Sequence, residues 1–63
     1  MHQSPIMEFF EYRHLPPRIQ VVSKRVAELA TYMDNSLPDG AEKSAGLRKL
    51  LEAKDCFVRA NLE

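Results

Sequence analysis

Apolar side chains between residues 17 and 36 recur at alternating intervals of three and four residues. These positions are Ile19, Val22, Val26, Leu29 and Met33. This spacing gathers them on one stripe of an α-helix and is typical of the seam between two packed helices. Pro17 suits the first turn of such a helix, where a missing N–H costs nothing. We therefore predict a helix over residues 17–36.

A second apolar stripe follows a short break. Pro38 ends the first helix, and the LPDG connection is too short for anything but an antiparallel neighbour. We predict the second helix over residues 40–60. Its stripe consists of Leu47, Leu50, Leu51, Phe57, Val58 and Leu62. Gly46, Ala53 and Ala60 recur every seven residues beside this stripe. Small residues in register allow another backbone to approach, so this flank is a candidate helix contact within or between subunits.

The first fifteen residues lack a regular apolar period, and we interpret them as an N-terminal aromatic arm. Pro5 and the pair Pro16–Pro17 bound this arm, and a short helical turn around Glu8 is compatible with its sequence. Phe9 and Phe10 suit the open end of the hairpin, and we expect at least one of them to cap it.

The chain has 63 residues, and so short a chain buries too little apolar surface to be more than marginally stable as an isolated monomer. Cys56 is the single cysteine, which excludes an internal disulfide. His2 and His14 lie too far from it, and from each other, for zinc-ligand spacing. We therefore predict an all-α fold: a single domain over residues 1–63, in which an antiparallel two-helix hairpin with its arm assembles into a helical homo-oligomer.

Charge and hydropathy exclude several classes of protein. Nine basic and nine acidic residues cancel, which does not favour a general polyanion binder such as a duplex DNA protein. No apolar run approaches the length of a membrane span, and the beginning of the chain lacks the continuous apolar region of a signal peptide. With a free cysteine, these features indicate a cytoplasmic protein without DNA or membrane partners.

Enzyme chemistry finds little support in the sequence. His14 has no nearby serine or cysteine partner, and Cys56 falls in the C-terminal half of a helix, away from the dipole that would lower its pKa. With only Gly40 and Gly46, the chain has no glycine-rich phosphate loop. We predict a protein that is not an enzyme, with no catalytic residue, cofactor or metal. The competing hypothesis of a thiol-dependent enzyme rests on Cys56 alone.

Groups suited to binding a flat anion concentrate in the arm and the helix after it. Tyr12 and His14 offer flat faces that could stack on a base, and Arg13, Lys24 and Arg25 could neutralise phosphate. Lys54 is unusual because it falls within the apolar stripe of the second helix. Its ammonium either reaches outward to solvent or points into a shared cavity and meets an anion.

Two motifs resemble one family of small helical-hairpin proteins. The first is the F-x-Y with a following histidine and proline pair, formed by Phe10, Tyr12, His14, Pro16 and Pro17. The second is P-D-x-x-E-K-S over residues 38–44, followed by L-x-K-L and E-A over residues 47–53. Over about residues 9–60, the chain resembles the anti-CBASS and anti-Thoeris proteins of phages, which share the Acb/Tad-type hairpin domain and act as sponges for nucleotide signals.

This resemblance implies a phage protein that acts in the cytoplasm of the infected bacterial host. It would sequester cyclic di- or trinucleotides or cyclic ADP-ribose isomers without degrading them, and would assemble from dimers, often into hexamers. It further implies that Tyr12 stacks on a base, beside Arg13 and His14. Lys24 and Arg25 are both candidates for a phosphate contact, and Arg48 or Arg59 could serve a further pocket.

A second hypothesis requires no small ligand. An exposed Val21 and Tyr32 beside Arg25 on one face of the first helix would suit a protein partner, although scattered apolar surface residues are common. Under this alternative the chain is an interaction hairpin that docks another protein through its apolar helix flanks.

Overall fold

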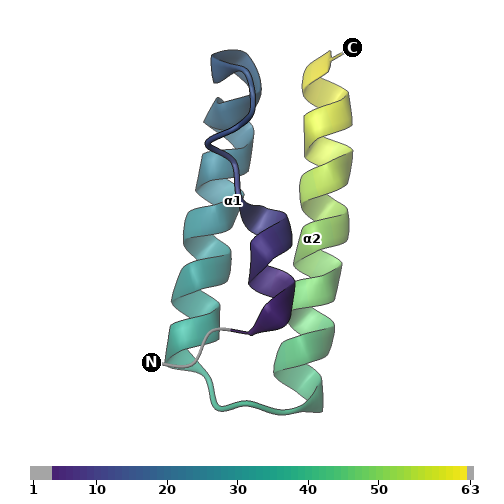
Figure 1. Cartoon of the computed structure of the whole chain (residues 1–63). Helices are drawn as coiled ribbons and strands as arrows, with labels where there is room; N and C mark the ends of the chain where they lie inside the picture. Colours follow the sequence, from purple (N-terminus) through teal and green to yellow (C-terminus); the bar gives the residue numbers. More distant parts are fainter. Residues whose placement is uncertain (1–3, 63) are drawn as a thin grey trace.

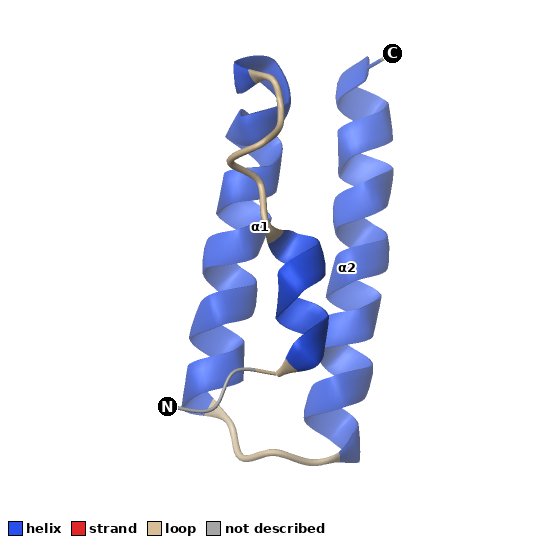
Figure 2. Ribbon diagram, in the orientation of Figure 1, coloured by secondary structure: helices blue, strands red, loops and turns tan. Residues whose placement is uncertain are grey.

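The computed structural model describes residues 4–62, which contain three helices. A short 3₁₀-helix, η1, spans Pro5–Phe10, α1 spans Pro17–Ser36, and α2 spans Ala41–Leu62. The two long helices run antiparallel and η1 lies across the seam between them (Figure 1). Apart from these helices, the described part of the chain consists of turns and loops (Figure 2). Residues 1–3 of the predicted arm, including His2, lie outside the described range.

The two-helix hairpin predicted from the apolar spacing is confirmed. The first helix begins with Pro16 as its N-cap and Pro17 in its first turn, as expected for residues whose φ is already close to the helical value. It ends at Ser36, because Leu37 adopts an extended conformation before Pro38. The second helix starts at Ala41, one residue later than predicted, and extends to Leu62.

The arm contributes directly to the core. Met7 and Phe10 of η1 are buried, with 6% and 1% of their surface exposed, and they pack with Val26, Ala30 and Leu47 of the long helices. Ala30 is fully buried, since a methyl side chain lets the surrounding elements approach closely. Phe9, by contrast, is 57% exposed. Phe10 is therefore the phenylalanine that enters the core, but it covers the seam between the helices partway along and not the open end of the hairpin, where we expected it.

Two lysines tie the elements together. Lys54, which we expected either to reach solvent or to point into a shared cavity, donates to the Phe9 carbonyl at 2.8 Å, and its side chain is 12% exposed. It thereby caps the C-terminal end of η1, where helical carbonyls lack partners. At the other end of the hairpin, Lys43 lies beside the α1–α2 connection, which it holds through hydrogen bonds described below.

Candidate functional site

The segment after η1 is shaped by one carboxylate. Glu11 accepts hydrogen bonds from the backbone N–H groups of Tyr12 and Arg13, at 3.0 and 2.9 Å, and forms a 2.9 Å ion pair with the Arg13 guanidinium. The Arg13 N–H is the main cause of a lowered pKa of the Glu11 carboxyl. The arm therefore carries a local ionic turn in which Arg13 already has a partner.

Tyr12 lies at the junction of this turn with the core. Its half-buried ring packs against the core, and the Arg13 guanidinium carbon is 5.2 Å from the ring centroid. That distance is within the range of a cation–π contact. Two shallow cavities of about 280 and 250 Å³ share Tyr12, Arg13, Ala27 and Thr31 in their walls. These cavities form the candidate site, and Tyr12 and Arg13 are the predicted residues that the structure brings together there.

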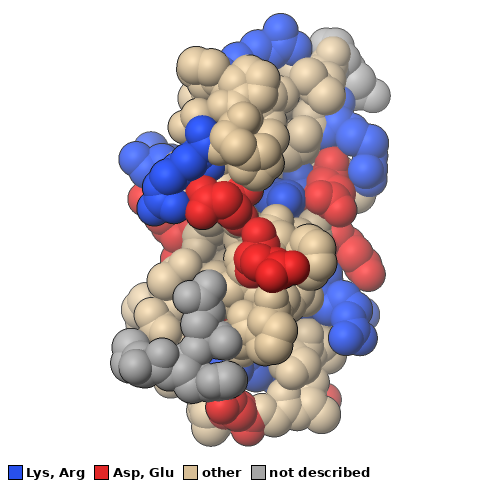
Figure 3. All heavy atoms as spheres, in the orientation of Figure 1, with Lys and Arg blue, Asp and Glu red and all other residues tan. Residues whose placement is uncertain are grey.

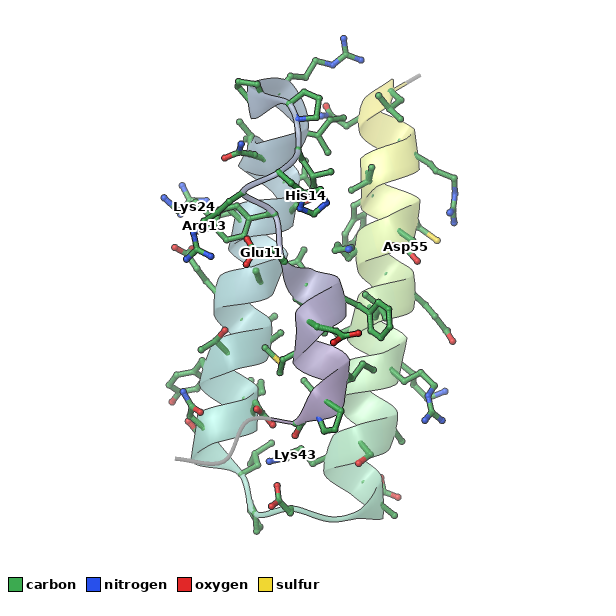
Figure 4. The ribbon with its side chains drawn as sticks, in the orientation of Figure 1. Glu11, Arg13, His14, Lys24, Lys43 and Asp55 are labelled. Atoms are coloured by element: carbon green, nitrogen blue, oxygen red, sulfur yellow. The ribbon has the colours of Figure 1, made fainter. Side chains whose placement is uncertain are left out.

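Lys24 and Arg25 occupy different flanks of α1. Ala27, Glu28 and Thr31 line the Tyr12 cavity, and Lys24 precedes them by three, four and seven residues, which places it on the same helix face. In Figure 4, Lys24 and Arg13 project on the same side of α1. Arg25 is rotated by about 100° from Lys24, toward the flank that carries Leu29. Lys24 is thus the better placed of the two for a ligand beside Tyr12.

His14 occupies the turn that leads into α1. The Gln20 amide fixes this turn by donating to the carbonyls of Arg13 and Leu15, at 3.3 and 2.7 Å. The His14 side chain is exposed and, among residues 4–62, makes no hydrogen bond. Figure 4 draws its ring between the two long helices, whereas Arg13 projects to the outer side of α1. The side chains of Arg13 and His14 therefore point in different directions, although the two residues are neighbours in sequence.

The two arginines predicted on the second helix lie away from the Tyr12 cavities. Arg48 borders a groove between η1 and α2, a hollow of about 530 Å³ that also involves Ile6, Phe9 and Leu51. Arg59, near the end of α2, donates to the Cys56 sulfur at 3.3 Å. Within one chain, the seven candidate residues therefore do not converge on a single pocket. Figure 3 shows basic and acidic groups interspersed on the η1 side of the molecule.

The sequence reasoning missed a buried ionic cluster at the base of the hairpin. The Lys43 ammonium lies 3.1 Å from an Asp34 oxygen and 2.6 Å from an Asp39 oxygen, and donates to the backbone carbonyls of Asp34 and Leu37 at 3.0 and 3.3 Å. Asp34 also accepts the hydroxyl and the N–H of Ser4. The side chains of Lys43 and Asp34 are only 6% and 2% exposed.

Both buried charges are stabilised by their partners. The Ser4 hydroxyl is the main cause of a lowered pKa of Asp34, and the bond to Asp39 is the main cause of a raised pKa of Lys43. A signal was present in the sequence: Asp34 lies four residues after Ala30, and Lys43 four before Leu47. These four-residue intervals place both charged residues on the same helix faces as the buried apolar residues. The cluster positions η1 and hence the arm, but its charged groups already form ion pairs and hydrogen bonds with one another.

Residues 4–62 contain no group of histidine, cysteine and carboxylate side chains that could hold a metal ion. None of the helices in this range has the length and apolar character needed to cross a membrane. Cys56 is exposed and its thiol is free, and its described contact is with Arg59 rather than with a general base. Comparison with family models, curated proteins and solved structures gives no match to this chain.

Proposed function

We propose that the protein binds and sequesters cyclic oligonucleotides or cyclic ADP-ribose isomers that serve as bacterial immune signals, and does not degrade them. A phage that carries it would thereby evade CBASS- or Thoeris-type defence inside the host cell. The proposal rests on the resemblance of the two sequence motifs. The structural observation that supports it best is the Tyr12 ring, held over a shallow cavity with Arg13 and with Lys24 on the same face.

This arrangement suits a flat anion. An aromatic face can stack on a base, and a nearby ammonium can neutralise a phosphate. The cavities of about 250–280 Å³ are shallow and small beside typical small-molecule pockets of about 300–1,000 Å³. A second subunit would deepen them, and a symmetric assembly, such as a hexamer built from dimers, would repeat the site for cyclic ligands. Arg48 and Arg59, remote from Tyr12 in one chain, would serve other pockets of that assembly.

Isothermal titration with a panel of cyclic dinucleotides, cyclic trinucleotides and cyclic ADP-ribose isomers tests this function. We expect tight binding of at least one class, and recovery of the intact ligand after the protein is denatured. Tyr12→Ala and Lys24→Ala should each weaken binding by about tenfold or more, as expected for the loss of one stacking or charged contact. Phe9→Ala is a matched control for the Tyr12 cavities alone, because it removes an exposed aromatic that lies outside them, in the groove beside Arg48.

Two results would count against the proposal. Absence of binding to every member of the panel at micromolar concentrations would reject it, and recovery of a cleaved ligand would reject sequestration in favour of catalysis. The runner-up function, an interaction hairpin, is favoured by a separate observation, since the side of the hairpin opposite η1 is apolar and exposed. It predicts that Tyr12→Ala has no effect on partner capture, whereas substitutions on that side abolish it.

A further inference from the structure

The turn after η1 gathers several hydrogen-bond donors on one carboxylate. The Oε1 atom of Glu11 accepts the backbone N–H groups of Tyr12 and Arg13, at 3.0 and 2.9 Å. The Arg13 guanidinium donates through one nitrogen to both Glu11 carboxylate oxygens, at 3.1 and 2.9 Å. Successive backbone N–H groups in a turn and a guanidinium are donors that proteins use to bind phosphates and other oxyanions. In this turn, the Glu11 carboxylate itself occupies these donors.

The same ion pair determines what covers the Tyr12 ring. The ring packs against the core cluster, and the Arg13 guanidinium lies over it, with its carbon atom 5.2 Å from the ring centroid. Because the Arg13 side chain is 74% exposed, it lies on the solvent side of the ring. A guanidinium is flat and stacks on an aromatic face much as a base does. Arg13 thus covers the face of Tyr12 that is open to a ligand.

The other charged groups beside Tyr12 are not paired in this way. Glu28 lines one of the two Tyr12 cavities together with Arg13, and Lys24 projects on the same side of α1 as Arg13 (Figure 4). Among residues 4–62, neither Glu28 nor Lys24 takes part in an ion pair. An anion that approaches the cavity therefore meets an unpaired ammonium at Lys24, but a guanidinium at Arg13 that already holds a carboxylate.

We propose that the Glu11 carboxylate is an internal competitor for the phosphate group of the ligand, which binds Arg13 by displacing it. In the ligand-free protein, Glu11 takes the place of the phosphate and the Arg13 guanidinium takes the place of the base. When the phosphate replaces Glu11, the guanidinium turns toward the phosphate and uncovers the Tyr12 ring for stacking. Glu11 is then a specificity-determining residue. This inference rests on the proposed function for the identity of the ligand.

The exposure of the ion pair makes this exchange possible. The side chains of Arg13 and Glu11 are 74% and 45% exposed, and an ion pair between exposed groups is worth a factor of about five or less in an equilibrium constant. An anion that offers charge alone exchanges one weak contact for another and gains little. A ligand that also stacks on Tyr12 gains about tenfold more. Glu11 therefore disfavours simple anions at the site and admits an anion that carries a base.

Glu11→Gln separates the charge of this residue from its role in the turn. The glutamine carbonyl still accepts the N–H groups of Tyr12 and Arg13, whereas the ion pair with the guanidinium is removed. Inorganic pyrophosphate serves as the anion, and the NMR signals of the Tyr12 ring report its binding in every variant. We expect Glu11→Gln to lower the dissociation constant for pyrophosphate about two- to fivefold. A Glu11 side chain that only shapes the turn predicts no gain in affinity, or a loss.

Glu28→Gln is the matched control, because it removes a carboxylate that lines the same cavity without an ion pair to Arg13. Each variant removes one negative charge, so the long-range attraction of an anion changes to a similar extent. At an ionic strength of about 0.15 M, where such attraction is screened, we expect Glu28→Gln to change the affinity less than about twofold. In an Arg13→Ala background, Glu11→Gln should have no larger effect than Glu28→Gln, since the competition requires the guanidinium.

The inference is overturned if Glu11→Gln leaves pyrophosphate binding unchanged or weaker, if Glu28→Gln gives an equal gain, or if the gain persists without Arg13. The same variants are then titrated with any messenger of the panel that binds the wild-type protein, and Glu11→Gln should tighten its binding as well. A gain for pyrophosphate in a protein that binds no messenger would support the competition and reject the proposed function. Messenger binding without a gain in Glu11→Gln would support the proposed function and reject the competition.

Discussion

Phe10 is the side chain on which the docking of η1 most depends, and its neighbour Phe9 provides an internal comparison. Phe10 is 1% exposed and belongs to the core cluster, whereas Phe9 is 57% exposed. We predict that Phe10→Ala destabilises the fold by about 3–5 kcal/mol, the usual cost of removing a buried aromatic ring and leaving a cavity. Phe9→Ala should change the free energy of unfolding by about 0.5 kcal/mol or less.

The predicted cost of Phe10→Ala is important because the total free energy of unfolding of so short a chain is small. At roughly 0.05–0.15 kcal/mol per residue, a chain of 63 residues has about 3–9 kcal/mol of stability. Phe10→Ala therefore removes a large share of it. Phe10→Leu, which retains most of the apolar contact, should cost only about 1–2 kcal/mol and provides a folded variant if the alanine variant unfolds.

Urea denaturation followed by circular dichroism measures these differences from the shift in midpoint at a constant slope. All variants are compared at one protein concentration, because association raises apparent stability by mass action. Equal effects at Phe9 and Phe10, or a loss below about 1 kcal/mol at Phe10, would refute the conclusion that Phe10 is the phenylalanine that enters the core.

Two further predictions concern buried polar groups. The pKa of Asp34 is lowered from 3.8 and that of Lys43 is raised from 10.5. The stabilisation from Asp34 is therefore complete above about pH 4 and is lost as the pH falls through the lowered pKa. The stabilisation from Lys43 is complete below about pH 10.5 and is lost as the pH rises through the raised pKa. Denaturation midpoints from about pH 2 to 7 should therefore fall on the acid side, and Asp34→Asn should flatten that fall; an unchanged slope would contradict this assignment. The Ser23 hydroxyl is buried without a hydrogen-bond partner among the described residues, so Ser23→Ala should raise the free energy of unfolding by about 1 kcal/mol. A loss of comparable size in the same denaturation assay would mean that the hydroxyl has a partner.

The long helices could be predicted because their signals are local and repeated. Pro17 and Pro38 bound a regular stripe, and LPDG leaves room only for an antiparallel return. The same reasoning could not choose between Phe9 and Phe10, because these adjacent residues have the same side chain. Their difference arises from the contact of η1 with both long helices, which is a tertiary property.

The candidate site was predictable in its composition and less so in its geometry. Tyr12 and Arg13 meet because they are neighbours on the same turn, and the helical period alone assigns Lys24 and Arg25 to different flanks. Arg48 and Arg59 were chosen for their charge, and charge does not determine where they lie relative to the arm. The Asp34–Lys43 pair was overlooked because exposed and buried charges look alike in a sequence unless their spacing from apolar neighbours is considered.

The hydrogen bonds of Lys43 and Lys54 connect residues at very different separations in the sequence. Lys43 joins groups four to nine residues away, whereas the Ser4–Asp34 and Lys54–Phe9 hydrogen bonds span 30 and 45 residues. Short loops close at a lower entropic cost than long ones, so the turn held by Lys43 can form early in folding and set the register of the hairpin. We expect docking of η1 to be a later step, which completes the core that the turn has begun to assemble. When refolding is followed by pulsed hydrogen exchange, the Met7 and Phe10 amides should therefore become protected after those of the two long helices.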